Sequence, residues 1–342
     1  MANSKSKVVR FAFASDPRYV SYRRTTVRLG AAMLMFLALF NGLDLVLYPL
    51  YAAFEATLTG KAMTVAASIY DMLIYALAFM LPVLFYRLIT PKGERIPLPL
   101  DTTAPRKLIL LVPAALAVIY CTALANGYLL DLIGLSASSS AYPDPAPAFA
   151  PYEAVLLYIS VSLIPAFCEE FLFRGLILSH LMPYGKTVAV IGSAVLFGLM
   201  HGTGEQILYT TVAGIVLALV TIESGSVWGG VIIHMFNNLL SVVEEVLFNR
   251  LDYRDEMLLY SAIEILVIGG GMICLAVLLL QRDQKPERES GSFYGRKEQG
   301  GLVAGAPLSS GTVMGFFSPT MIAFFVISII EIAAGLLWYI RY

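Results

Sequence analysis

The sequence predicts an all-α fold, a polytopic transmembrane helical bundle of about eight to nine spans. Hydrophobic residues make up 58% of the 342 residues and charged residues only 14%, about half the share that is usual in a soluble domain. The mean hydropathy is +0.76. So little charge does not suffice to cover a water-exposed surface, and we therefore expect the chain to lie in lipid.

Nine apolar segments have the length or composition of membrane spans. A helix needs roughly 20 apolar residues to cross about 30 Å of hydrocarbon. The candidate spans cover residues 29–51, 62–86, 108–128, 153–180, 187–201, 206–222, 226–248, 258–281 and 313–340. They lack the alternating period of a membrane β-barrel, which favours helices. The fifth and sixth are short, so their boundaries are the least defined.

Basic residues gather in three segments, 5–28, 87–107 and 282–297, whereas 129–152 has none. With nine spans, all three segments lie on one side of the membrane. Cytoplasmic loops carry the excess of Lys and Arg, so we expect a cytoplasmic N-terminus. A bacterial plasma membrane is preferred to the endoplasmic reticulum. The net charge of −1 gives no indication of a nucleic-acid partner.

The chain divides into three regions. Residues 1–150 hold N-terminal spans and an outer loop, 136–152, that is rich in Pro and Ser. Residues 151–250 form a helical core with short turns, and residues 251–342 add C-terminal spans with a charged cytoplasmic loop, 282–303. No internal repeat of the transporter type is evident. The three cysteines are odd in number and lie in apolar segments, which indicates buried thiols.

The fourth span contains three ionisable residues, Glu169, Glu170 and Arg174. A charge near the centre of a span costs about 2.5–3.5 kcal/mol on insertion scales, so each of the three needs a partner. Glu170 and Arg174 are four residues apart and can pair along one helix face. Glu169 lies about 100° around the helix from Glu170, so it needs a partner from elsewhere.

Two of the three histidines fall in the following spans of the same region. His201 shares a helix face with Phe197, and His234 shares one with Asn238. A carboxylate, two imidazoles and an amide at membrane depth suit water activation and oxyanion stabilisation. At 1.5 Å per residue, Glu169 and His201 lie roughly 20 Å from the cytoplasmic ends of their spans, but His234 only about 12 Å.

Other polar residues at span depth lack such partners. Asp44, Asp71, Glu264 and Glu331 are expected to form hydrogen bonds between helices. His180 is expected at the cytoplasmic membrane interface.

The patterns Glu-Glu-x-x-x-Arg, Phe-x-x-x-His and His-x-x-x-Asn, in this order over residues 150–250, resemble the signature of the CAAX protease and bacteriocin-processing family (CPBP, or Abi). This resemblance implies an intramembrane endopeptidase. By position, it implies that Glu169 is the general base and that His201 helps to hold it. It implies that His234 and Asn238 stabilise the oxyanion. It further implies that Glu170 and Arg174 form a supporting ion pair and that Phe197 packs beside the site.

Whether a metal takes part is left open by the residues. Glu169, His201 and His234 could bind zinc and leave one open position. However, the chain contains no His-Glu-x-x-His pair, and Asn is a poor zinc ligand. We therefore prefer chemistry without a metal cofactor, with zinc as the alternative.

The expected partners are the lipid bilayer and a peptide or protein substrate, with or without a lipid group, cut near the cytoplasmic face. Two other functions remain open. The chain could be a non-catalytic immunity or scaffold protein of the same fold. It could also be a proton-coupled transporter that uses the buried carboxylates, although the absence of internal repeats disfavours this.

Overall fold

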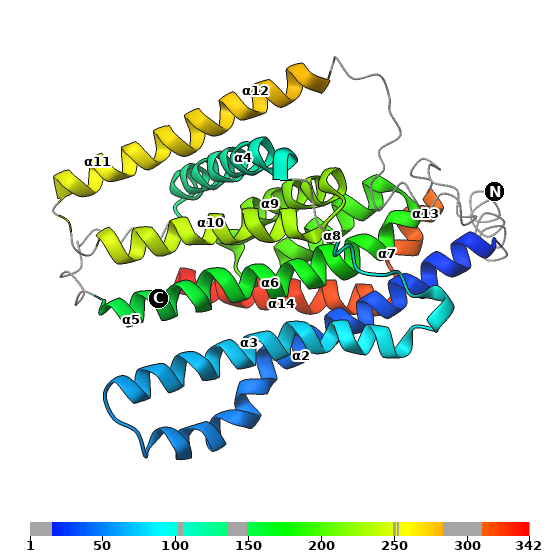
Figure 1. Cartoon of the computed structure of the whole chain (residues 1–342). Helices are drawn as coiled ribbons and strands as arrows, with labels where there is room; N and C mark the ends of the chain where they lie inside the picture. The colour runs from blue at the N-terminus through cyan, green and yellow to red at the C-terminus, as the bar shows by residue number, and fades with distance from the viewer. Residues whose placement is uncertain are drawn as a thin grey trace.

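The computed structural model describes residues 16–101, 105–135, 149–248, 251, 253–282 and 310–341. Within these ranges the chain forms helices and no strand, which confirms the all-α fold (Figure 1). Eight helices in this part of the chain are long and apolar enough to cross a membrane, and one apolar helix is shorter. The chain is therefore an integral membrane protein with the predicted count of eight to nine spans.

The described residues form a series of helical segments. In chain order they are α2 (Pro17–Glu55), α3 (Lys61–Ile89), η1 (Lys92–Glu94), α4 (Pro105–Leu132), α5 (Pro151–Leu157), η2 (Tyr158–Leu163), α6 (Ile164–Glu170), η3 (Phe171–Leu178), α7 (Ser179–Leu181), η4 (Met182–Tyr184), α8 (Lys186–Met200), α9 (Gly204–Ser224), α10 (Val227–Phe248), α11 (Tyr253–Glu264), η5 (Ile265–Gly269), α12 (Gly270–Arg282), α13 (Ser310–Phe316) and α14 (Pro319–Arg341).

The helices run side by side in one bundle (Figure 1). At one edge α2 and α3 form a hairpin, and α14 packs against α2. At the opposite edge α12 packs against α4. The continuous helix α5 to α7 lies between these edges together with α8, α9 and α10, so it contacts both α3 and α10.

Helix α2 is longer than the first predicted span. Its start is fixed by Asp16, whose side chain accepts a hydrogen bond of 2.8 Å from the Arg18 amide, and by Pro17 in the first turn, a position that tolerates proline. With 39 residues it measures roughly 58 Å at 1.5 Å per residue. The ends of α2 therefore extend well beyond a hydrocarbon layer of about 30 Å.

Helix α8, the fifth predicted span, is short because it ends inside the bundle. Its 15 residues measure roughly 22 Å, and it stops just before His201. Gly202 follows with a φ of 69°, a conformation that glycine adopts without cost. Helix α8 packs closely on α9, where a Cβ at Gly214 would lie 3.0 Å from Ala194 Cα.

Several described basic residues lie at the end of the bundle where α2 begins, but Lys61 and Arg254 lie at the starts of α3 and α11, and Arg174 is buried inside the bundle. Arg28 of α2 forms an ion pair with Glu94 of η1, which joins the start of α2 to the loop after α3. The predicted outer loop at 136–148, most of the charged loop from 283 onwards, Arg250 and the basic residues before residue 16 lie outside the described residues. The cytoplasmic assignment of this end remains a prediction.

Some polar residues at span depth join helices as predicted. Asp44 accepts a hydrogen bond of 2.7 Å from Tyr70, and Glu331 accepts one of 3.1 Å from Asn41. His180 differs from its prediction, because its ring is buried rather than placed at the lipid interface. Its Nδ1 lies 2.8 Å from the carbonyl of Leu176, and its Nε2 accepts a hydrogen bond from the loop after α3.

Candidate active site

The centre of the candidate site is a buried ion pair on the continuous helix α5 to α7. Glu170 and Arg174 are both fully buried, and Arg174 Nη1 donates to Glu170 Oε1 at 2.7 Å, as their four-residue spacing predicts. Arg174 also donates to the carbonyl of Gly214 at 3.2 Å, and its guanidinium lies 4.3 Å from the centre of the Phe197 ring. The arginine therefore has partners on three helices.

This ion pair holds His234 of α10. His234 Nδ1 lies 2.9 Å from Glu170 Oε1. Since an ionised carboxylate only accepts hydrogen bonds, Nδ1 carries the proton and Nε2 is left for other partners. Gly230, one turn earlier on α10, permits this approach, because a Cβ there would lie 2.6 Å from Glu170 Oε2.

Glu169 has two partners from other helices. Its Oε1 accepts a hydrogen bond from the hydroxyl of Tyr75 on α3, and its Oε2 lies 3.9 Å from His234 Nε2. The residue is 4% exposed, and Oε2 has no hydrogen-bond partner within the described protein. If a water oxygen lay about 2.8 Å from both Oε2 and Nε2, the angle Oε2–water–Nε2 would be about 90°. One water molecule can donate two hydrogen bonds at this angle.

His201 lies at the end of α8, one aromatic ring away from this pair. Its Nδ1 donates to the carbonyl of Phe197 at 2.8 Å. The Phe197 ring centre lies 5.0 Å from that of His201 and 5.9 Å from that of His234. Phe197 therefore contacts both imidazoles. In the described part of the chain, no hydrogen bond or ion pair joins His201 to Glu169.

Asn238 lies one turn beyond His234 but points its amide to another helix. Its Nδ2 donates to the carbonyl of Val161 in η2 at 3.1 Å, and its Oδ1 accepts a hydrogen bond from Asn237. The nearby Ser162 also joins η2 to α10, through a bond of 2.7 Å to the carbonyl of Met235. Asn238 thus borders the site without contacting Glu169.

Local helix geometry helps to place the two glutamates. Two π-helical segments, η2 and η3, lie directly before and after α6, which carries both residues. Such wide turns are rare in helices and are frequent at functional sites. A π-turn changes the helical phase, so Glu169 and Glu170 need not follow the regular 100° steps of the flanking residues.

The three residues considered for the zinc alternative, Glu169, His201 and His234, do not form an assembled metal site among the described residues. Among the described residues, no group of three or more His, Cys, Asp and Glu side chains is arranged to hold a metal ion. Glu169 and His234 face each other, but Glu169 Oε1 is occupied by Tyr75. As placed in the described chain, Glu169, His201 and His234 do not form a ready three-ligand group, and metal dependence stays a prediction.

Two residues of the site, Tyr75 and Gly230, belong to no sequence motif. Tyr75 lies in the second predicted span without any motif around it, and its contact with Glu169 spans 94 residues of sequence. Gly230 precedes His234 by one turn. Its small size is the one sequence feature that could have indicated a close contact between this part of α10 and another helix. Both act through contacts between helices, which sequence spacing does not encode.

The start of α10 is covered by the loop after α3, because Val227 donates its amide to the carbonyl of Pro99 at 2.9 Å and Trp228 Nε1 donates to that of Leu100 at 3.2 Å. These two bonds hold the loop after α3 to the first turn of α10.

Comparison with known protein families gives one match. Residues 151–240 match the family described as "Type II CAAX prenyl endopeptidase Rce1-like", and this segment contains all three motifs. The comparisons with curated proteins and with solved structures found no match. The match supports a protease-type enzyme that acts on a peptide or protein in a membrane. Residues 151–240 thus carry the Rce1-like pattern of type II CAAX prenyl endopeptidases, which confirms the predicted resemblance to the CPBP family.

Proposed function

We propose that the chain is an intramembrane endopeptidase in which Glu169 activates the attacking water. One observation carries this proposal: Glu169 Oε2 lies 3.9 Å from His234 Nε2, while its second oxygen is held by Tyr75. A buried carboxylate with one oxygen fixed and the other facing an imidazole suits a general base.

The reaction follows from the two facing atoms. A water between them donates one hydrogen to Glu169 Oε2 and the other to His234 Nε2, so its lone pair points away, toward a substrate carbonyl. Glu169 takes the first proton as the water oxygen bonds to the carbonyl carbon. It returns this proton to the amide nitrogen when the C–N bond breaks. The products are a carboxylic acid and an amine, and Glu169 is ionised again.

The surrounding residues have supporting roles in this proposal. Glu170 and Arg174 fix the proton on His234 Nδ1 and therefore keep Nε2 directed at the water. Asn238 stabilises the oxyanion. To do so, its amide must release the Val161 carbonyl and donate a hydrogen bond to the substrate instead. His201, whose Nδ1 is engaged by Phe197, offers Nε2 to the water or to the substrate.

The proposed substrate is a peptide or protein segment with a lipidated cysteine near its C-terminus, as the description of the matching family suggests. Such a substrate would be anchored in the bilayer beside the site. We further propose that no metal cofactor takes part, since a buried carboxylate beside an imidazole can activate water without one. A cytoplasmic cleavage position follows from the predicted orientation.

The test is the cleavage rate of Glu169→Gln on a farnesylated peptide and on its unlipidated form, in reconstituted vesicles. Loss of a general base costs about 10²- to 10⁴-fold in rate. Glu331→Gln is the matched control, because Glu331 is also a membrane-depth glutamate with a hydrogen-bond partner, and it should keep its activity. Cleavage by Glu169→Gln at the wild-type rate would reject the assignment.

A further inference from the structure

A pocket of about 680 Å³ lies on the first turns of α2, away from the candidate active site. Six residues of α2 line it, Tyr19, Val20, Arg23, Arg24, Val27 and Arg28. These residues recur at spacings of three and four, so they form two adjacent rows along the helix. A seventh residue, Met314, comes from α13.

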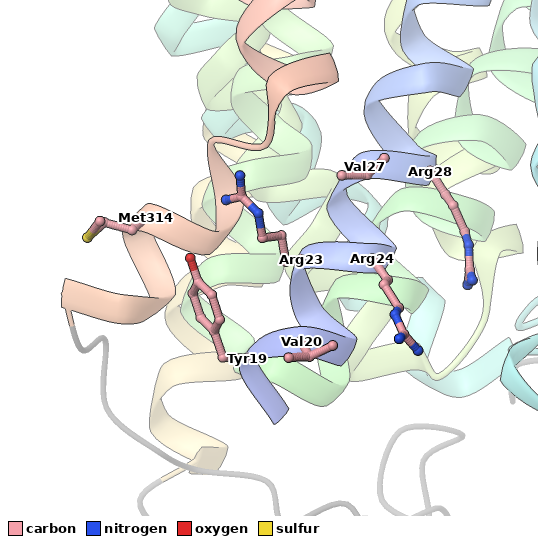
Figure 2. Close-up of a pocket in the computed structure, with 7 residues that line it drawn as sticks. All are labelled: Tyr19, Val20, Arg23, Arg24, Val27, Arg28 and Met314. Carbon is pink, nitrogen blue, oxygen red and sulfur yellow. The ribbon is translucent and has the colours of Figure 1, made fainter. Parts of the chain in front are cut away.

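The pocket has an apolar floor between two basic sides (Figure 2). Arg23 and Tyr19 lie on the side of α2 that faces α13, whereas Arg24 and Arg28 extend on the opposite side. Val20 and Val27 are between them. A ligand here would meet positive charge on both sides and apolar surface beneath.

The walls of the pocket are fixed before any ligand binds. Thr26 Oγ1 donates to the carbonyl of Gly315 at 2.8 Å, and Thr320 Oγ1 donates to the carbonyl of Val27 at 2.8 Å. Next to them, α14 approaches so closely that a Cβ at Gly30 would lie 2.6 Å from the Met321 amide nitrogen. A preformed site loses less entropy when it binds.

The positive charge of the pocket is largely uncompensated. Arg28 pairs with Glu94, but within the described chain no ion pair joins Arg23 or Arg24 to a carboxylate. Arg23 and Arg24 also precede residue 29, where the apolar part of α2 begins, so we place them at the level of the lipid headgroups.

We propose that this pocket binds a phosphate group, supplied by the headgroup of an anionic phospholipid. Planar guanidinium groups suit phosphate oxygens, to which they donate paired hydrogen bonds. The floor of Val20 and Val27 would receive the first part of an acyl chain. This site is separate from the Glu169 site, so the proposal stands or falls independently of the proteolytic function.

The test is a binding titration of the full chain in detergent with dihexanoyl phosphatidylglycerol, dihexanoyl phosphatidylcholine and glycerol phosphate. The anionic lipid should bind most tightly, and the double variant Arg23→Gln, Arg24→Gln should weaken its binding about tenfold or more, since each basic residue contributes strongly to anionic-lipid affinity. The double variant Arg23→Lys, Arg24→Lys should bind with an affinity between those of the wild type and the Gln variant, because the charge remains but the paired hydrogen bonds of the guanidinium groups are lost. Circular dichroism melting curves show whether each variant is folded.

The control is Arg18→Gln, compared with the single variants Arg23→Gln and Arg24→Gln. It removes one positive charge from the same helix outside the pocket and should change affinity less than about twofold. Equal weakening by Arg18→Gln would overturn the proposal, because it would mean diffuse attraction to the whole helix end. Equal binding of both lipids would also overturn it. Glycerol phosphate that binds as tightly as the lipid would support the phosphate site and identify a soluble source.

Discussion

Tyr75→Phe tests the candidate site through a residue that no sequence motif predicts. The substitution removes the hydroxyl that donates to Glu169 Oε1 and keeps the ring, whose centre lies 4.7 Å from that of Phe79 and 6.3 Å from that of Phe40. A hydrogen bond to a charged group is worth about 1.5–3 kcal/mol. If this bond orients the base, kcat should fall about 10- to 100-fold, at 1.36 kcal/mol per factor of ten, while KM changes less than about twofold.

The matched control is Tyr70→Phe. Tyr70 lies on the same helix and also donates to a carboxylate, that of Asp44, at 2.7 Å, but this pair does not contact Glu169. Its loss should leave kcat unchanged. Activity is measured as initial rates of peptide cleavage in vesicles, at a temperature where both variants are shown to be folded.

A double-mutant cycle makes the test sharper. When Glu169 is already Gln, the added Tyr75→Phe change should lower the residual rate no further, because residues that act as a unit have non-additive effects. A kcat for Tyr75→Phe within twofold of the wild type, or additive losses in the cycle, would refute the role of Tyr75 in holding the base.

Three further outcomes are expected. Arg174→Lys should destabilise the fold by about 1–3 kcal/mol, because lysine has no planar guanidinium group to bond both Glu170 and the Gly214 carbonyl. Thermal unfolding in detergent measures the loss of stability. An unchanged unfolding midpoint would contradict the prediction. Gly230→Ala should reduce cleavage several-fold, because the added Cβ would lie 2.6 Å from Glu170 Oε2. Gly127→Ala is the control and should not reduce cleavage, because a Cβ there would have no neighbour within 4 Å. Equal cleavage rates for the two variants would argue against the close approach at Gly230. Treatment with a zinc chelator should leave cleavage intact, and a loss that zinc restores would show that a metal takes part.

The span pattern and the motif residues could be predicted from sequence because they depend on local rules. Apolar segments of sufficient length specify transmembrane helices, and the chain forms eight long ones among the described residues. The Glu170–Arg174 pair was predictable for a similar reason, since residues four apart lie on one helix face. These features need no knowledge of how the helices pack.

The partners of Glu169 could not be predicted in this way. The resemblance implied that His201 helps to hold the base, yet it is His234 whose Nε2 lies 3.9 Å from Glu169 Oε2. Tyr75 comes from a helix far away in the sequence. The loop after α3 bonds to the start of α10, a contact that no spacing in the sequence indicates.

The sequence by itself therefore determined that this chain lies in a membrane, which residues carry charge inside it, and which of these share a helix face. The tertiary structure alone decided which imidazole faces Glu169, that Tyr75 binds its other oxygen, and that Phe197 contacts both histidines. The physical reason is that hydrophobicity and helical periodicity act along one segment. The height and rotation of one helix against another depend instead on close contacts such as those at Gly214 and Gly230, which are decided only when the helices pack.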